Sequence, residues 1–188
     1  IDAGERSRLR ITIPEALELI EKQTDGQIGK RDFYPSPAVV PLARAMGGLK
    51  KRVIPEVSNH PTCGVATFII VEDDEMMPIT RYMDIGRFMQ TMNEVVEAIG
   101  VGKGAKARLN LQKGLKFVRF GILKDLLTDV LRGGSYEALR NMMKKMIMIS
   151  VVAFMDLYNF DLERAQMCTI HYALPDGTLR QFCPYNTL

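Results

Sequence analysis

The last part of the chain contains the pattern that most limits its fold, because two cysteines flank a turn between two short β-type runs. The runs extend from Thr169 to Ala173 and from Thr178 to Phe182, and Leu174-Pro-Asp-Gly177 separates them. Pro, Asp and Gly favour a tight turn, since they supply a fixed φ, a side chain that bonds the local backbone, and a free positive φ. The pattern therefore predicts a β-hairpin.

The position of the turn centre decides whether the two cysteines face each other. A centre between Pro175 and Asp176 pairs Cys168 with Cys183 across the hairpin. Directly paired positions have Cβ atoms about 4.5–5.5 Å apart on one face of the sheet. Two such thiols can share a metal or, with adjustment, form a disulfide. A bulge in the turn would shift this register by one residue.

A third cysteine heads an earlier hairpin. Cys63 precedes an apolar run from Val65 to Val71, and after an acidic turn the chain returns from Met77 to Met83. Pro78 cannot donate to a ladder, so the return strand is expected at a sheet edge. Gly64 would let backbone approach the Cys63 thiolate closely, which suits a metal or a cluster. From the residues alone, a small buried apolar role is favoured for Cys63.

The segments between the hairpins are expected to be mostly helical. Apolar residues at steps of three and four predict an amphipathic helix from Ile85 to Ile99, which Gly100 stops. Further helices are expected after Pro14, from Leu42 to Met46, from Leu115 to Leu131, and from Ser135 towards Tyr158. The predicted class is therefore α+β, with two Cys-headed β-hairpins packed with amphipathic helices.

Four segments are expected along the chain. They are a helix and Pro-rich connector that continues from an upstream core (1–58), the first Cys-hairpin and its helix (59–100), a basic and Met-rich helical region (101–160), and the C-terminal Cys-hairpin (161–188). The chain begins at Ile1 without an initiator Met, and its start looks cut out of a longer protein.

Composition limits the location and the partners of the protein. Three Cys are too few for a disulfide framework and indicate a reducing compartment. The expected location is cytoplasmic, with peripheral membrane contact as an option, since the run from Met146 to Met155 is too short to span a bilayer. A net charge of +3 is mild, and no nucleic-acid partner is expected. The basic run from Lys103 to Lys124 is interpreted as a solvated face rather than as an anion contact.

Three segments, taken in order, carry a resemblance to a known family. They are Asp32 to Pro37; His60 to Gly64, running on to Pro78 to Asp84; and Phe154 to Arg164, followed by the final Cys-hairpin and Cys183-Pro-Tyr-Asn186. With them, most of residues 11–186 resembles the C-terminal part of radical S-adenosylmethionine (radical SAM) enzymes of the archaeal tetraether lipid synthase type.

The resemblance implies an iron–sulfur enzyme of lipid biosynthesis that acts after a radical SAM partial barrel. In the complete protein, a [4Fe–4S] cluster would cleave S-adenosylmethionine, and radical chemistry would join isoprenoid chains by C–C bonds. Cys63 would ligate an auxiliary cluster, and Cys168 and Cys183 would give two thiolates to a mononuclear iron or to another cluster. The implied partners are an upstream radical SAM core, in the same or another chain, and a lipid-like substrate.

One departure from the family limits what this chain is expected to do alone. The Cys-x3-Cys-x2-Cys run that binds the radical cluster is absent. The chain is therefore expected to act only as a fragment of a complete enzyme, and no catalytic residue is assigned. The alternative is a non-catalytic, metal-stabilised protein-interaction module. For Cys168 and Cys183, metal ligation is favoured over a disulfide and over inert thiols, and His171 is expected on the opposite strand face from Cys168.

Overall fold

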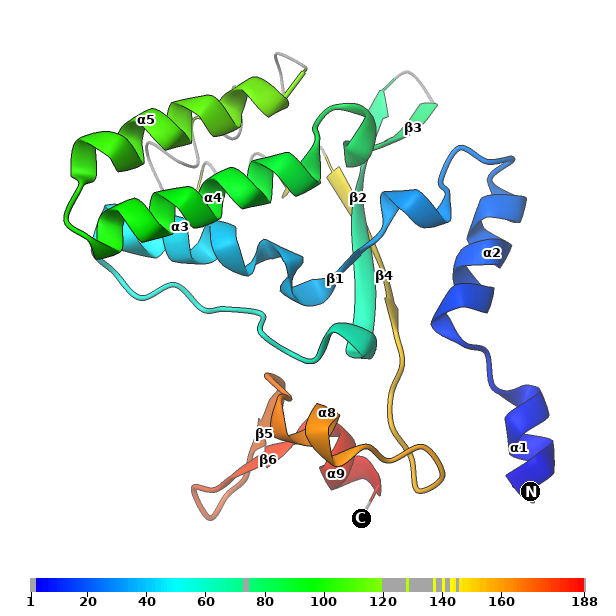
Figure 1. Ribbon diagram of the computed structural model, residues 1–188. Coiled ribbons are helices and arrows are strands. Elements are labelled where there is room, and N and C mark those ends of the chain that lie inside the picture. Colours follow the sequence, from blue (N-terminus) through cyan, green and yellow to red (C-terminus); the bar gives the residue numbers. More distant parts are fainter. Residues whose placement is uncertain are drawn as a thin grey trace. The chain divides into compact units, whose positions relative to one another are not determined.

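The structure, a computed structural model, describes residues 3–72, 75–119, 128, 137, 140, 143, 144 and 146–187. Helices and small antiparallel sheets alternate along the chain (Figure 1), so the predicted α+β class is confirmed. The predicted place behind a radical SAM partial barrel and the four-segment division stay predictions. The chain forms two compact units. Unit 1 contains Ile1–Pro37, Val57–Ala66 and Ser150–Leu188, and unit 2 contains Ala38–Glu56 and Thr67–Ile149.

Unit 1 contains short helices and the C-terminal hairpin. Its elements are α1 (Ala3–Leu9), α2 (Ile13–Gln23), β1 (Tyr34–Pro35), α8 (Leu162–Gln166), β5 (His171–Ala173), β6 (Leu179–Gln181) and α9 (Phe182–Thr187), with 3-10 turns at Lys30–Asp32 and Pro61–Cys63. Helix α2 begins where Pro14 predicted, because Thr12 and Glu15 form a capping box.

Unit 2 is built around two packed helix pairs. Its elements are α3 (Val40–Lys50), β3 (Glu75–Pro78), α4 (Ile85–Gly100) and α5 (Gly104–Gly114), with 3-10 turns at Ile79–Arg81 and Leu115–Phe117, and a further 3-10 turn, Ser36–Val39, leads into α3. Helix α4 confirms the predicted amphipathic helix, and its residues Phe88, Met92 and Val95 are fully buried. Both α3 and α5 pack against α4, so its apolar face forms the centre of this unit.

Helix α3 is longer than the predicted segment from Leu42 to Met46, because Gly47 and Gly48 lie inside it. A Cβ built on Gly48 would lie 2.9 Å from Cδ1 of Ile99 on α4. The glycine therefore allows the two helices to approach each other closely instead of ending the helix.

Two longer strands, β2 (Gly64–Glu72) and β4 (Met146–Val152), pair with each other. In unit 1, the start of β2 pairs antiparallel with β1. In unit 2, the rest of β2 pairs antiparallel with β3, which confirms the first hairpin. The return strand is shorter than predicted, since it ends at Pro78 and a 3-10 turn follows it.

The Met-rich helix predicted from Ser135 towards Tyr158 is wrong from Met146 onwards, because β4 occupies this stretch. Its β-branched residues, Ile147, Ile149, Val151 and Val152, favour a strand over a helix. Most residues before Met146 in this predicted helix, and most of the helix predicted from Leu115 to Leu131, lie outside the described residues. In the part of the chain that the structure describes, no helix has both the length and the apolar character needed to cross a bilayer.

Candidate functional site

All three cysteines that the sequence singled out belong to unit 1. Cys63 ends a 3-10 turn directly before β2, Cys168 follows α8, and Cys183 lies in the first turn of α9. Each side chain is half-buried, and each thiol is free. The disulfide alternative for Cys168 and Cys183 is therefore not formed.

The register of the closing hairpin differs by one residue from the prediction. Tyr172 pairs with Arg180, so the centre lies on Asp176 rather than between Pro175 and Asp176. The N–H of Gly177 donates to Leu174 O at 3.0 Å, and Gly177 has a φ of 80°. These features define a three-residue hairpin loop with a bulge at the left-handed glycine.

Because of this shift, Cys168 and Cys183 do not lie directly opposite each other, although the sequence predicted that they would. Cys168 and Cys183 also lie outside the paired residues of the hairpin, since β6 ends at Gln181 and α9 follows. They remain linked through one carbonyl group. The Cys168 thiol donates to Ile170 O at 3.2 Å, and the N–H of Phe182, next to Cys183, donates to the same oxygen at 2.9 Å.

The extended segment after β4 connects Cys63 and Cys183. The N–H of Ala153 donates to Cys63 O at 2.9 Å, and the N–H of Met155 donates to Cys183 Sγ at 3.5 Å. Alternate N–H groups of an extended chain point to the same side, about 7 Å apart. The Cys63 carbonyl and the Cys183 sulfur therefore both accept N–H groups from the same edge of this extended segment.

Gly64 lies close to the neighbouring strand β4. A Cβ at this position would lie 3.0 Å from Val151 O and 3.4 Å from Val152 Cγ2. The glycine therefore admits the neighbouring strand, and the prediction that it gives access to the Cys63 thiolate is not needed to explain it.

His60 organises the turn that contains Cys63. Its Nδ1 accepts the N–H of Thr62 at 3.3 Å and lies 2.8 Å from Thr62 Oγ1. With Nδ1 accepting from the backbone, Nε2 carries the proton of a neutral ring, and it lies 4.0 Å from Oε1 of Glu163 on α8. His171, by contrast, is exposed on β5.

Arg164 is a buried cation that the sequence reasoning missed. Its side chain is 9% exposed, and Nη2 donates to Ala153 O at 2.5 Å. Its Nε has no hydrogen-bond partner among the described residues. Arg164 therefore holds α8 against the segment that also contacts Cys63 and Cys183. Asp161 caps α8, since its Oδ1 accepts the N–H of Arg164 at 3.2 Å.

The three cysteines do not form a closed metal site. Within the described ranges, no three His, Cys, Asp or Glu side chains gather closely enough to hold a metal ion. The prediction of a metal-binding chain is therefore not supported by this geometry, and each cysteine offers a single thiolate. The assignment of Cys63, Cys168 and Cys183 as ligands stays a prediction.

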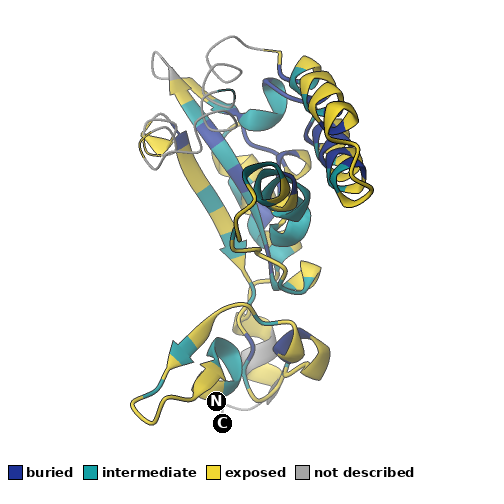
Figure 2. Ribbon diagram, turned by 90° about the vertical axis from the view of Figure 1, so that its left-hand side faces the viewer, coloured by how far each residue is buried: buried dark blue, intermediate teal, exposed yellow. Residues whose placement is uncertain are grey.

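Four aromatic rings gather beside Cys183. Tyr172 and Phe182 stack with their centroids 5.3 Å apart, Phe154 lies 5.3 Å from Phe182, and Tyr185 lies 4.9 Å from Tyr172. We call these four residues the aromatic cluster. The hairpin beside it is mostly exposed (Figure 2).

The sequence contains a signal for this cluster. Tyr172 pairs with Arg180, so Phe182 is its diagonal neighbour on the same face of the hairpin. Tyr185 lies three residues after Phe182, which places both on one side of α9. The signal depends on the register of the hairpin, and the predicted register was wrong by one residue.

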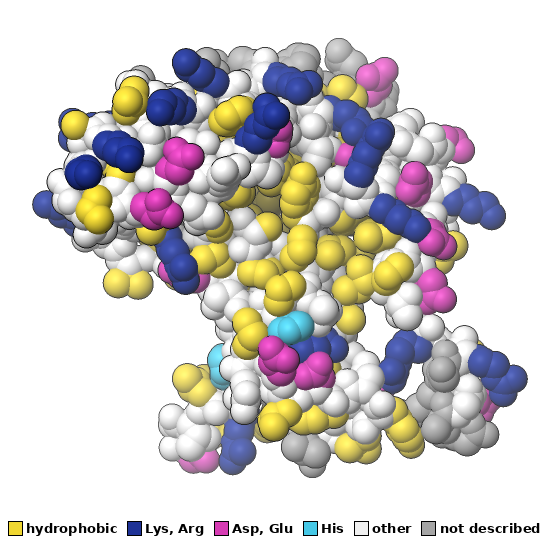
Figure 3. All heavy atoms as spheres, viewed as in Figure 1, with side chains coloured by type: hydrophobic (Ala, Val, Ile, Leu, Met, Phe, Trp, Pro, Cys, Tyr) yellow, Lys and Arg dark blue, Asp and Glu magenta, His cyan; other side chains and the backbone are white. Residues whose placement is uncertain are grey.

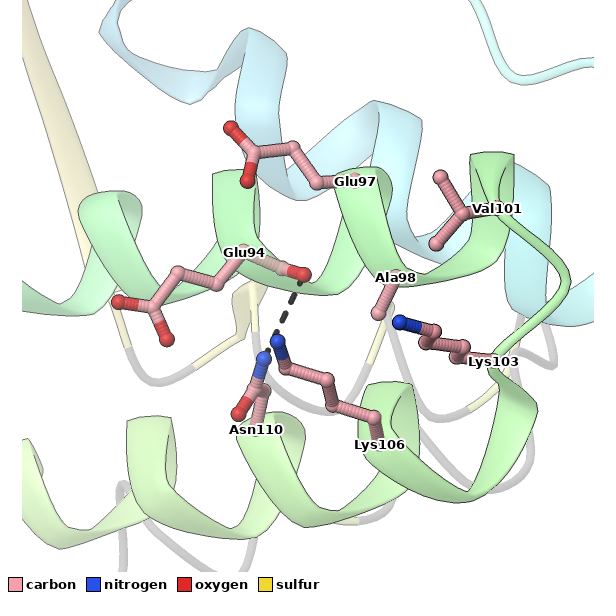
Figure 4. Close-up of a pocket in the computed structure, with 7 residues that line it drawn as sticks. All are labelled: Glu94, Glu97, Ala98, Val101, Lys103, Lys106 and Asn110. Atoms are coloured by element: carbon pink, nitrogen blue, oxygen red, sulfur yellow. Dashed lines mark hydrogen bonds between the residues drawn. The ribbon is translucent and has the colours of Figure 1, made fainter.

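Unit 2 offers a second candidate, a cavity of about 220 Å³ between α4 and α5 (Figure 4). Its lining residues are Glu94, Glu97, Ala98, Val101, Lys103, Lys106 and Asn110. Asn110 is 2% exposed, and its Nδ2 donates to Glu94 O at 3.4 Å. The cavity is smaller than most small-molecule sites and has charges of both signs, so it is the weaker candidate.

The basic run forms an exposed face along α5. Figure 3 shows Lys and Arg side chains over this part of unit 2. The members between Lys103 and Arg119 are all exposed, as a solvated face requires, and Lys124 lies outside the described residues.

Comparison with known proteins corrects the family assignment. No protein-family model matches the chain. The chain is 39% identical, over 192 aligned residues, to the 7,8-dihydro-6-hydroxymethylpterin dimethyltransferase of Methanocaldococcus jannaschii. The alignment covers 95% of this chain and 38% of that enzyme, so the chain spans well under half the length of the curated relative.

This finding overturns the predicted resemblance to a tetraether lipid synthase. The similar protein is named for methyl transfer to a pterin, whereas the sequence analysis predicted C–C bond formation between lipid chains. The predictions of a lipid-like substrate and of lipid biosynthesis are wrong with it, and the comparison names no upstream radical SAM partner. The chain is similar to part of a pterin dimethyltransferase.

Proposed function

We propose that this chain is the pterin-binding part of a methyltransferase. The observation that carries the proposal is the 39% identity to a pterin dimethyltransferase over nearly the whole chain. The structure adds an exposed aromatic cluster in unit 1, whose ring faces suit a flat heterocyclic substrate. The cavity of unit 2 supports such a substrate less well, since it is small and charged.

S-adenosylmethionine and iron form the finer part of this proposal. When bound, S-adenosylmethionine would supply the methyl group, and a cysteine-ligated iron centre would supply one-electron chemistry. The cysteines support iron only as individual ligands, because the described residues bring no three ligands together. Cys183 is the best prepared, since its sulfur accepts an N–H, as the sulfurs of iron–sulfur sites commonly do.

Iron loading tests this finer part. We expect the anaerobically loaded chain to retain iron with thiolate-to-iron absorption bands, and Cys183→Ser to lose more of both than Cys63→Ser. Serine keeps the size of the side chain but removes the thiolate. Equal iron content in the wild type and in a variant lacking all three cysteines would contradict ligation by these residues.

Direct binding tests the proposed function itself. The full chain is titrated calorimetrically, without oxygen, with 7,8-dihydro-6-hydroxymethylpterin. Guanine is the matched control ligand, because it shares the amino-pyrimidinone edge but has a different second ring. We expect saturable binding of the pterin and weaker binding of guanine. No pterin binding, or equal binding of both compounds, would refute the proposal.

A further inference from the structure

The aromatic cluster of unit 1 combines residues from three elements. Phe154 follows β4, Tyr172 lies on β5, and Phe182 and Tyr185 lie on α9. The rings contact each other in a chain, with centroid separations of 4.9–5.3 Å. Such separations are typical of favourable aromatic pairs, so the rings hold one another in place.

The outer rings of this chain remain open to solvent. Phe154 is 57% exposed and Tyr185 is 51% exposed, whereas Tyr172 and Phe182 between them are half-buried. The aromatic cluster thus has a packed inner pair and an exposed outer pair. We call it the aromatic platform, because it is rigid and has free ring surface. Large exposed apolar surfaces of this kind mark binding sites.

The backbone holds the platform in a fixed position. Phe182 N–H donates to Ile170 O at 2.9 Å, Met155 N–H to Cys183 Sγ at 3.5 Å, and Thr187 Oγ1 to Met155 O at 3.2 Å. These bonds connect α9 to Ile170, directly before β5, and to the segment that contains Phe154. The rings are therefore positioned before a ligand arrives, which lowers the entropic cost of binding.

A polar group lies beside the rings on the same face of the hairpin. Arg180 pairs directly with Tyr172, so the two side chains leave the same face. A guanidinium is a fork of donors without any acceptor, and it binds carbonyl and other acceptor edges in one plane. An aromatic surface with adjacent donors matches a flat bicyclic ring that has a carbonyl on its edge.

We infer that this aromatic platform, with Arg180 at its side, is the stacking site for the bicyclic ring of the pterin substrate. The inference rests on the proposed function for the nature of the substrate. The residues that would contact the pterin ring are Phe154, Tyr172, Phe182 and Tyr185 of unit 1. Stacking of a nucleobase on an aromatic side chain is worth about 1–3 kcal/mol, roughly a 5- to 150-fold change in affinity, and a pterin presents a similar ring face.

The test measures the affinity of the full chain for 7,8-dihydro-6-hydroxymethylpterin through the fluorescence of the pterin. Tyr185→Ala and Phe154→Ala should each weaken binding about tenfold, and Tyr185→Phe should preserve it because the ring remains. Tyr158→Ala is the matched control, since Tyr158 is 55% exposed but lies outside the platform. Circular dichroism checks that each variant is folded, and Tyr185→Leu replaces any variant that is not.

The outcomes separate this inference from the proposed function. If the wild type binds the pterin and the folded ring variants bind it equally well, the stacking site is wrong and the proposed function stands. If the wild type does not bind the pterin, the proposed function fails and the site fails with it. If Tyr185→Ala dissociates a dimer of the wild type without weakening pterin binding, the platform is an interface between copies of the chain, and the inference is overturned.

Discussion

Asp156 shows how a single residue fixes the loop that carries Phe154 in unit 1. Its Oδ1 accepts the N–H of Tyr158 at 2.8 Å, and its Oδ2 pairs with Arg10. The hydrogen bond from Tyr158 and the Arg10 guanidinium lower the pKa of this carboxyl. The loop is therefore best held when Asp156 is ionised.

The pH dependence of this loop follows from the direction of that pKa shift. A carboxyl whose pKa is lower in the folded state stabilises that state above its unfolded pKa, about 4, and loses the contribution as pH falls through the folded pKa. We expect NMR titration to place the Asp156 pKa below that of the same residue in the unfolded chain, and Arg10→Gln to raise it only partly, because the Tyr158 N–H remains. A folded-state pKa equal to or above the unfolded-state pKa would contradict this account.

Gly177 is the residue that sets the register of the closing hairpin. Its φ of 80° is a conformation that other residues adopt at a cost of about 1–2 kcal/mol, and no atom lies within 4 Å of a Cβ built there. Gly177→Ala should therefore speed exchange of the Leu174 amide, which donates to Thr178 O, about 5- to 30-fold. Gly177→Asn is the control, because asparagine tolerates this conformation and should have a smaller effect. Equal exchange in Gly177→Ala and wild type would show that the turn does not depend on the glycine.

At the scale of elements, sequence patterns located those helices and strands whose signal is local. The periodicity from Ile85 to Ile99 and the capping residues around Pro14 predicted α4 and α2, because an apolar face and a cap depend on near neighbours. The patterns failed where a distant segment decided the outcome. Strand β4 was predicted as helix because its apolar run fits either structure, and its pairing with β2 selects the strand.

The candidate site was predicted only in part for the same reason. The hairpin and its cysteines were visible in the sequence, but one residue in the loop decided whether Cys168 and Cys183 were paired. The aromatic cluster depends on that register and on the contact with Phe154, which lies far away in sequence. Spacing could bring Tyr172, Phe182 and Tyr185 together only with the correct register, and it could not add Phe154.

The close packing of α3 on α4 predicts that replacing the glycine at their contact destabilises the protein. In Gly48→Ala the new Cβ would meet Ile99 at 2.9 Å and 3.3 Å, and since Ile99 is branched, a single rotation does not relieve both contacts. We expect the free energy of unfolding of unit 2 to fall by about 1–3 kcal/mol in urea denaturation. Gly100→Ala on α4 is the control, because nothing lies within 4 Å of its Cβ, and it should be neutral or stabilising. A Gly48→Ala protein as stable as the Gly100→Ala protein would argue against close packing of these helices.

At the scale of the whole molecule, the two units differ in what they offer a ligand. Unit 2 has a fully buried helix core and a solvated basic face. Unit 1 has the three free thiols, the buried Arg164 and the exposed aromatic cluster. The similarity to a pterin dimethyltransferase covers both units, but the chemistry of ring binding points to unit 1.

Hydrogen–deuterium exchange of the full chain, with and without 7,8-dihydro-6-hydroxymethylpterin, tests this account most directly. Binding at the aromatic platform should slow exchange in 168–187 and around Phe154, and leave α4 and α5 unchanged. Pterin-dependent protection confined to α4 and α5, or none at saturating pterin, would contradict the claim that unit 1 binds the substrate.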